Sequence, residues 1–136
     1  MRFVDTNILL YAISNDPAEA TKAESAREIL ESRDLALSVQ VIQEFFVQAT
    51  RPSRSNPVSY EHALGLIQSF MRFPIQEITM AIVLMAMSTR EKFRLSYWDA
   101  AIIESARAMK CDVVLSEDLS LRQDFGGITV INPFAP

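Results

Sequence analysis

The first twelve residues, MRFVDTNILLYA (1–12), contain the strand-to-helix unit from which the fold is predicted. Phe3 and Val4 indicate a short buried strand, and the apolar residues that begin at Ile8 predict a helix directly after it. Asp5 stands between the two. An aspartate at this position can cap the helix that follows, or it can be one of several carboxylates gathered around a metal ion. Taken alone, the stretch favours the cap.

The same alternation of strand and helix continues along the chain. Further strands are expected at 35–38, 75–78, 112–116 and 126–133, and further helices within 17–34, 39–51, 60–73, 79–93 and 97–110. Asp16, Ser38, Ser59 and Ser96 stand where helix N-caps are expected. Strands that alternate with helices are joined by right-handed crossovers. The sequence therefore predicts an α/β fold with a mainly parallel sheet of four or five short strands, covered on both faces.

Length and composition bound the class of protein. With 136 residues, 49% of them hydrophobic, we expect one globular domain spanning 1–136. No run approaches the roughly 18 apolar residues of a membrane span, and no secretory leader is apparent. A single cysteine, Cys111, fits a reducing compartment. We therefore expect a soluble cytoplasmic protein that does not bind membranes.

The net charge of −4 speaks weakly against a general nucleic-acid coat protein, which is normally basic. The chain has 13 basic and 17 acidic residues. If four carboxylates belong to a metal site, the remaining 13 acids balance the 13 bases. The acidic composition therefore does not exclude a nucleic-acid substrate.

Three more acids stand in unusual surroundings. Glu44 lies among apolar residues of its helix, beside Phe45, where an unpaired carboxylate is costly; the alternative is that it reaches solvent or pairs with an arginine such as Arg51. Asp99 follows Ser96 at the spacing of a capping box, yet the turn around it is apolar. Asp118 follows the 112–116 strand and could cap the next turn.

Two neighbouring acids are assigned to the surface. Glu104, five residues after Asp99, points elsewhere around its helix, and Glu117 has no feature that favours burial. Ser116, at the end of its strand, offers a hydroxyl that could orient a carboxylate. Met80, Met85 and Met87 are interpreted as core residues, with an adaptable interface as the alternative.

In parallel sheets the functional crevice lies beyond the carboxyl ends of the strands, and both Asp5 and the Glu117–Asp118 pair follow a strand directly. Gathering four carboxylates within about 5 Å costs roughly 3 kcal/mol per close pair at a dielectric near 20. A hard divalent cation offsets this cost. Since His62 and Cys111 are the only histidine and cysteine, the oxygen-only set favours Mg²⁺ or Mn²⁺. Such ions activate water for attack at phosphorus, so phosphodiester hydrolysis is the expected reaction class.

Four motifs carry a family resemblance. They are FVDTNILLYA (3–12), VIQEFF (41–46), SYWDAAI (96–102) and LSEDL (115–119). In this order they resemble the PIN-domain family, and within it the VapC-like toxins of type II toxin–antitoxin systems. The resemblance covers essentially the full chain; no single motif is specific, but the four together are.

The resemblance implies a three-layer α/β/α sandwich and a Mg²⁺- or Mn²⁺-dependent endoribonuclease. Its metal-binding and catalytic acids would be Asp5, Glu44, Asp99 and Asp118. Its small polar site residues would be Thr6, Asn7 and Ser116. The extra acid Glu117 is a departure from the family pattern and leaves the choice between Glu117 and Asp118 open.

The resemblance also implies partners: an RNA substrate, a cognate antitoxin whose C-terminal segment covers the acidic pocket, and a second copy in a homodimer. Candidate contacts to RNA phosphates are Arg51, Arg54, Arg90 and Arg94. Ordinary solvated charge explains these arginines equally well. The sequence specifies neither the RNA that is cleaved nor whether one or two ions bind.

Two alternatives belong to other functional classes. One is a catalytically inactive PIN-like module that serves as a protein- or RNA-binding scaffold; the presence of all four acids argues against it. The other is a receiver-like phosphoacceptor or an aspartyl phosphatase. A phosphatase needs a second aspartate two residues after the first, where this chain has Asn7, and no lysine follows the 112–116 strand directly.

Overall fold

A five-stranded parallel sheet forms the middle layer of the molecule. The computed structural model describes residues 1–119 and 124–135. The strands are β1 (Arg2–Val4), β2 (Leu35–Ser38), β3 (Ile75–Gln76), β4 (Val113–Leu115) and β5 (Thr129–Ile131), in the spatial order β3-β2-β1-β4-β5. The predicted parallel sheet of four or five short strands is confirmed.

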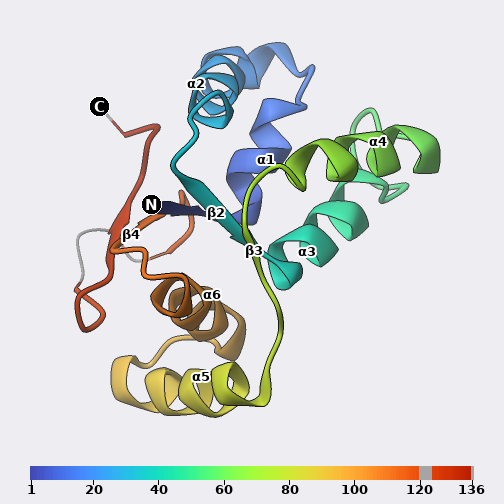
Figure 1. Ribbon diagram of the computed structural model, residues 1–136. Helices are drawn as coiled ribbons and strands as arrows, with labels where there is room; N and C mark the ends of the chain where they lie inside the picture. Colours follow the sequence, from blue (N-terminus) through green and yellow to red (C-terminus); the bar gives the residue numbers. More distant parts are fainter. Residues whose placement is uncertain (120–123, 136) are drawn as a thin grey trace.

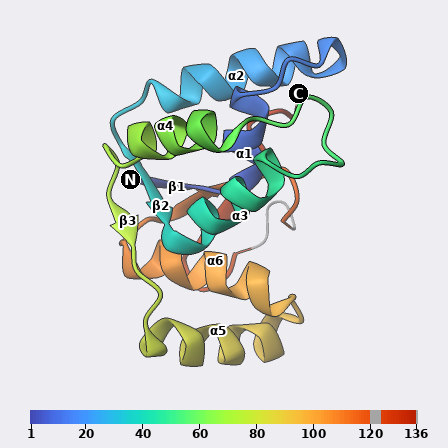
Figure 2. The same cartoon turned by 90° about the vertical axis from the view of Figure 1, so that its right-hand side faces the viewer.

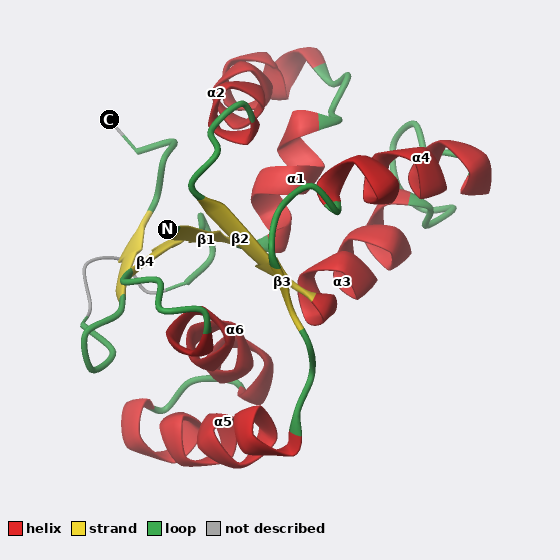
Figure 3. Ribbon diagram, viewed as in Figure 1, coloured by secondary structure: helices red, strands yellow, loops and turns green. Residues whose placement is uncertain are grey.

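Helices cover both faces of this sheet. They are α1 (Thr6–Ala12), α2 (Ala20–Leu30), α3 (Val39–Ala49), α4 (Tyr60–Phe70), α5 (Met80–Phe93) and α6 (Tyr97–Ala108). Figures 1 and 3 show α1 to α4 on one side of the strands and α5 and α6 on the other, and Figure 2 shows the same division from a second direction. The fold is therefore the expected three-layer sandwich.

Local signals place most helix starts correctly. Ser38, Ser59 and Ser96 each accept a hydrogen bond from a backbone N–H of the following first turn. Asp16 is a cap too, but of a short 3₁₀ helix, η1 (Pro17–Glu19), that precedes α2. The strand expected at 75–78 stops at Gln76, because its neighbour β2 ends at Ser38, where α3 begins.

The core lies on both sides of the central strand. Phe3 and Val4 of β1 are fully buried, as are Leu35, Leu37 and Val114 of the adjacent strands. In the parallel register Phe3 pairs with Ala36 and Val4 with Leu115, so β1, β2 and β4 end at the same edge. Every residue that directly follows these strands is thus brought to one side of the molecule.

One surface assignment and one core assignment made from the sequence are wrong. Glu104 is 2% exposed, because α6 is sandwiched between the sheet and α5 and is buried all round at this level. Conversely, the methionines interpreted as core are exposed: Met80 by 69%, Met85 by 49% and Met87 by 52%. Helix α5 packs on α6 through Ile82, Ala86 and Thr89 instead.

None of the helices in the described ranges combines the length and the apolar character that a membrane span requires.

Candidate active site

One pocket at the carboxyl edge of the sheet contains all four predicted acids. Asp5 comes from the end of β1, Glu44 from α3, Asp99 from the first turn of α6 and Asp118 from the segment after β4. The pocket is also lined by Thr6, Asn7, Leu10, Gln40, Gln48, Trp98 and Ile102. Side chains that are up to 113 positions apart in the sequence therefore share one site.

Asp5 is buried and is held at both oxygens. Its Oδ1 accepts a hydrogen bond from the backbone N–H of Thr6 (2.8 Å), and its Oδ2 accepts one from the Ser116 hydroxyl (2.8 Å). Burial raises the pKa of Asp5 to about 6, and the negative charges of Glu44 and Asp99 add to the shift, while the two hydrogen bonds oppose it. Asp5 is therefore both the cap of α1 and a carboxylate of the pocket.

Glu44 is oriented by two neutral donors. Thr6 Oγ1 donates to Oε2 (2.7 Å), and Gln40 Nε2 donates to Oε1 (2.9 Å). Gln40 also donates to the carbonyl oxygen of Trp98 (3.1 Å), which joins α3 to the start of α6. Within the described ranges Glu44 forms no ion pair, so the pairing with Arg51 considered from the sequence is not observed.

Gln40 contacts one of the acids and was not predicted as a site residue from the sequence. It lies one helical turn before Glu44, at the i, i+4 spacing at which side chains on a helix meet. That spacing was a usable signal. Its second bond, to Trp98, depends on how α3 and α6 pack and could not be read from the sequence.

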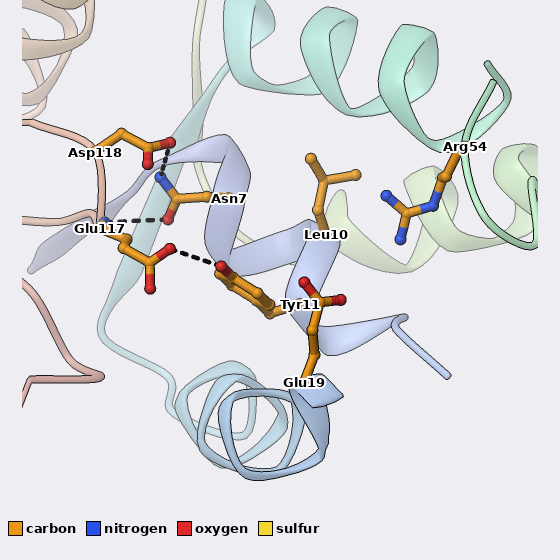
Figure 4. A pocket seen from close by; sticks show the side chains of 7 residues that line it. All are labelled: Asn7, Leu10, Tyr11, Glu19, Arg54, Glu117 and Asp118. Carbon is orange, nitrogen blue, oxygen red and sulfur yellow. Dashed lines mark hydrogen bonds between the residues drawn. The ribbon is translucent and has the colours of Figure 1, made fainter. Parts of the chain in front are cut away.

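Ser116 and Asn7 connect Asp5 to Asp118. Ser116 is fully buried; its hydroxyl donates to Asp5 and accepts from the backbone N–H of Asp118 (3.2 Å). Asn7 Nδ2 donates to Asp118 Oδ2 (3.0 Å), as Figure 4 shows, and to Ser116 Oγ (3.3 Å). Together with Thr6, the polar residues expected beside the acids do contact them.

Glu117 is used differently from Asp118. It accepts a hydrogen bond from the Tyr11 hydroxyl (2.6 Å) and forms an ion pair with Lys22 (2.5 Å). It lines a neighbouring pocket, whereas Asp118 lines both that pocket and the one with the other three acids. The geometry thus favours Asp118 as the fourth acid.

The acidic pocket lacks a compensating cation. Among its described lining residues there is no lysine, arginine or histidine. Burial raises the pKa of Asp99, and the charges of Glu44 and Asp118 raise it further, against the effect of its hydrogen bond with Ser96. Repulsion among these carboxylates, together with an all-oxygen donor set, fits a hard divalent cation such as Mg²⁺ or Mn²⁺.

The acids are gathered but do not converge on one point. In the part of the chain that the structure describes, no three carboxylates stand close enough to ligate one ion together. This is compatible with Mg²⁺, which commonly keeps several waters and binds one or two carboxylates directly. The pocket therefore fits an ion held by some of the acids directly and by others through water.

Only one of the four candidate arginines reaches this region. Arg54 lines the neighbouring pocket, which it shares with Asn7 and Asp118. Arg51 is exposed in the loop after α3, and Arg90 forms a surface ion pair with Glu91. Arg94 ends α5 in a left-handed backbone conformation, with φ of 56°. Neither pocket is lined by Arg51, Arg90 or Arg94.

Comparisons with known proteins agree with this architecture. Residues 2–123 match the family model described as PIN domain, and no curated protein matches the sequence. The fold is similar to a chain of a toxin–antitoxin complex from Klebsiella pneumoniae, with a TM-score of 0.72 and 23% identity over 98% of each chain. It is also similar to Mycobacterium tuberculosis VapC20, described as a sarcin–ricin loop cleaving toxin (TM-score 0.64, 15% identity, 87% of this chain and 90% of that one). A third similar structure is FitAcB from Neisseria gonorrhoeae (TM-score 0.68, 20% identity, 98% and 99%). At these identities the likeness shows the fold.

Proposed function

Because the chain belongs to the PIN domain family, we propose that it is a Mg²⁺- or Mn²⁺-dependent endoribonuclease that hydrolyses RNA phosphodiester bonds. The observation that carries the proposal is the pocket that four carboxylates from four separate segments line, without a basic residue among its described lining. A divalent cation would offset the repulsion among these carboxylates, whereas a surface that only binds protein does not require them to share one pocket.

In this proposal Asp5, Glu44, Asp99 and Asp118 hold the ion. When bound, the ion supplies water activation and stabilises charge that develops at phosphorus. The chain's other residues orient these acids: Ser116 fixes Asp5, Thr6 and Gln40 fix Glu44, and Asn7 fixes Asp118. Neutral donors suit this task, because they hold a carboxylate without removing the negative charge that binds the cation.

We further propose that this activity is that of a toxin in a type II toxin–antitoxin module, acting in the cytoplasm. Similar folds in chains described as toxin–antitoxin complexes support this, including the one from Klebsiella pneumoniae. The proposal adds two protein partners, a cognate antitoxin that covers the acidic pocket and a second copy of this chain. Expression with and without a co-expressed neighbouring antitoxin gene tests it: growth arrest that the co-expressed protein relieves is the expected result.

Cleavage of RNA by purified protein tests the enzymatic proposal. We expect wild-type protein to cleave RNA with Mg²⁺ or Mn²⁺ and to be inactive with chelator. Asp99→Asn removes a proposed ligand with almost no change in volume, and we expect at least about a 100-fold loss of cleavage, since even outer-shell changes cost 10–100-fold. Glu91→Gln is the matched control, because Glu91 is an exposed acid on α5. Near-wild-type cleavage by Asp99→Asn would remove Asp99 from the proposed ligands, whereas no cleavage by the wild type with either metal would support the inactive scaffold.

A further inference from the structure

A second pocket adjoins the acidic one along α1. It is lined by Asn7, Leu10, Tyr11, Glu19, Arg54, Glu117 and Asp118 (Figure 4). Three of these residues, Asn7, Leu10 and Asp118, also line the acidic pocket. The two pockets are therefore neighbouring parts of one depression, joined at these three residues.

Arg54 enters this second pocket from the loop between α3 and α4, and Figure 4 shows its guanidinium directed toward Leu10 and Glu19. Its Nε is buried and has no hydrogen-bond partner among the described residues. Arg54 also forms no ion pair in the described ranges. A buried donor without an acceptor costs free energy, more so on a charged group, so the described residues leave this guanidinium able to take a further acceptor.

The acids of the second pocket are mostly engaged elsewhere. Glu117 is neutralised by Lys22 and also accepts from Tyr11. Glu19 accepts a hydrogen bond from the Ser14 hydroxyl (2.6 Å). Asp118 belongs to the acidic pocket at the opposite end from Arg54 (Figure 4). The depression thus has one end with four carboxylates, suited to a cation, and another end where the Arg54 guanidinium lies beside Glu19, with Leu10 and Tyr11 between the two ends.

We propose that Arg54 binds a backbone phosphate of the RNA substrate at a nucleotide next to the cleaved bond. The inference rests on the proposed function and adds the register of the strand: one phosphate at the acids, another at Arg54, and the apolar surface of Leu10 and Tyr11 beneath the nucleotide between them. A guanidinium matches a phosphate through paired N–H donors. Arg54 is in this sense a positioning residue, because it contacts the substrate at a phosphate that does not react.

The test compares Arg54→Gln, Arg54→Lys and Arg33→Gln. Arg33 is an exposed arginine just before β2, at the opposite edge of the sheet, so Arg33→Gln makes the same charge change far from the site. Steady-state cleavage of a mixed-sequence single-stranded RNA gives KM and kcat. Equilibrium binding of the same RNA, with Mg²⁺ and in an Asp99→Asn background that does not cleave, gives the salt dependence.

We expect Arg54→Gln to raise KM about 10-fold with kcat nearly unchanged, because a binding contact equal in ground and transition states is lost. The slope of log affinity against log salt should become shallower by about 0.7. Arg54→Lys should keep the slope and lose part of the affinity, and Arg33→Gln should match wild type. Melting curves of the variants check that the fold is intact.

Equal KM and salt slope in Arg54→Gln and Arg33→Gln would overturn the inference and assign the guanidinium to Glu19 or to a carboxylate of a protein partner. A fall in kcat at unchanged KM would also overturn it, since Arg54 would then act through the structure of the site. Either result leaves the proposed function intact if wild type cleaves RNA. Absence of cleavage by wild type overturns the proposed function instead, and this inference with it.

Discussion

At the scale of single residues, Asp5 performs two tasks that the sequence presented as alternatives. One oxygen caps α1 through Thr6, and the other accepts from Ser116 inside the pocket. The cap is thus present, but it does not exclude a role in binding a cation. Asparagine separates the two tasks, because it caps a helix nearly as well as aspartate but carries no charge.

Asp5→Asn should therefore raise the melting temperature of the metal-free protein, because it relieves repulsion from Glu44 and Asp99 and the burial of a charge. With excess Mg²⁺ the wild type should gain stability by ligand binding, and the variant should gain much less. Melting curves of both proteins, with chelator and with metal, give the comparison. If the two proteins melt alike in chelator and shift alike with metal, Asp5 is a cap and no more.

The raised pKa of Asp5 also predicts a pH dependence. It is about 6 in the folded protein against an ordinary value of 3.8, so between these values the folded state binds more protons than the unfolded chain. The contribution of Asp5 to metal-free stability should then be greatest below pH 4 and fall as pH rises toward 7, by up to about 3 kcal/mol. Urea unfolding at pH 4, 5 and 7 measures it. The stability difference between Asp5→Asn and wild type should grow over this range; a constant difference would contradict the assignment.

At the scale of elements, an ion pair with a buried carboxylate joins α5, α6 and the segment before β5. Glu104 accepts from Thr89 (2.8 Å) and from Arg107 Nε (3.0 Å). Arg107 in turn donates to the carbonyl oxygens of Phe125 (2.5 Å) and Gly126 (2.6 Å). Glu104 thus holds the Arg107 guanidinium, and that guanidinium satisfies two backbone carbonyl groups of the chain reversal before β5.

Removing the cation of this pair should be costly. Arg107→Met leaves Glu104 buried without its charged partner, and we expect a loss of about 3 kcal/mol in the free energy of unfolding. Arg90→Met is the matched control, because Arg90 pairs with Glu91 on the exposed surface, where ion pairs contribute little. Urea denaturation of both variants makes the comparison. A loss no larger than that of Arg90→Met would show that the buried pair is unimportant for stability.

At this scale, features that depend on neighbouring residues could be predicted from the sequence, and features that depend on packing between distant segments could not. Strands and helix starts follow from local features such as Ser38, Ser59 and Ser96, and these were predicted correctly. The gathering of acids followed from strand order and a family resemblance. The burial of Glu104 depends instead on α5 packing over α6, and no feature within α6 distinguishes a buried carboxylate with a partner from an exposed one.

At the scale of the whole molecule, α5 has apolar residues on two opposite sides. Ile82, Ala86 and Thr89 form the buried side against α6, whereas Met80, Leu84 and Met87 repeat the same spacing two positions earlier and are exposed. A helix that is apolar all round is normally buried all round. The same apolar pattern is expected whether a helix is buried within its own chain or against a second copy of the chain. The sequence alone therefore could not show that these methionines lie on the surface of the single chain.

We therefore expect the proposed homodimer to use the exposed side of α5. In light scattering after size exclusion, wild type should have twice the chain mass of 15.3 kDa. Leu84→Lys combined with Met80→Lys should shift the protein to the monomer, because two charges would be buried in the interface. Met71→Lys changes an exposed methionine at the end of α4 and should leave the dimer unchanged. A monomeric wild type, or a double variant that stays dimeric, would rule out this interface.

The central position of β1 governs when the site can come into existence during protein synthesis. Strand β1 is made first, yet one of its two neighbours, β4, begins only at Val113. A growing chain that ends earlier has no strand on that side of β1 and lacks Ser116, which holds Asp5. Since translation proceeds from the amino end, a ribosome-bound fragment carries Asp5 and Glu44 long before Asp99 and Asp118 exist. If the chain is the nuclease proposed above, its acidic pocket therefore cannot act on RNA near the ribosome until the segment that carries Ser116 and Asp118 has been made.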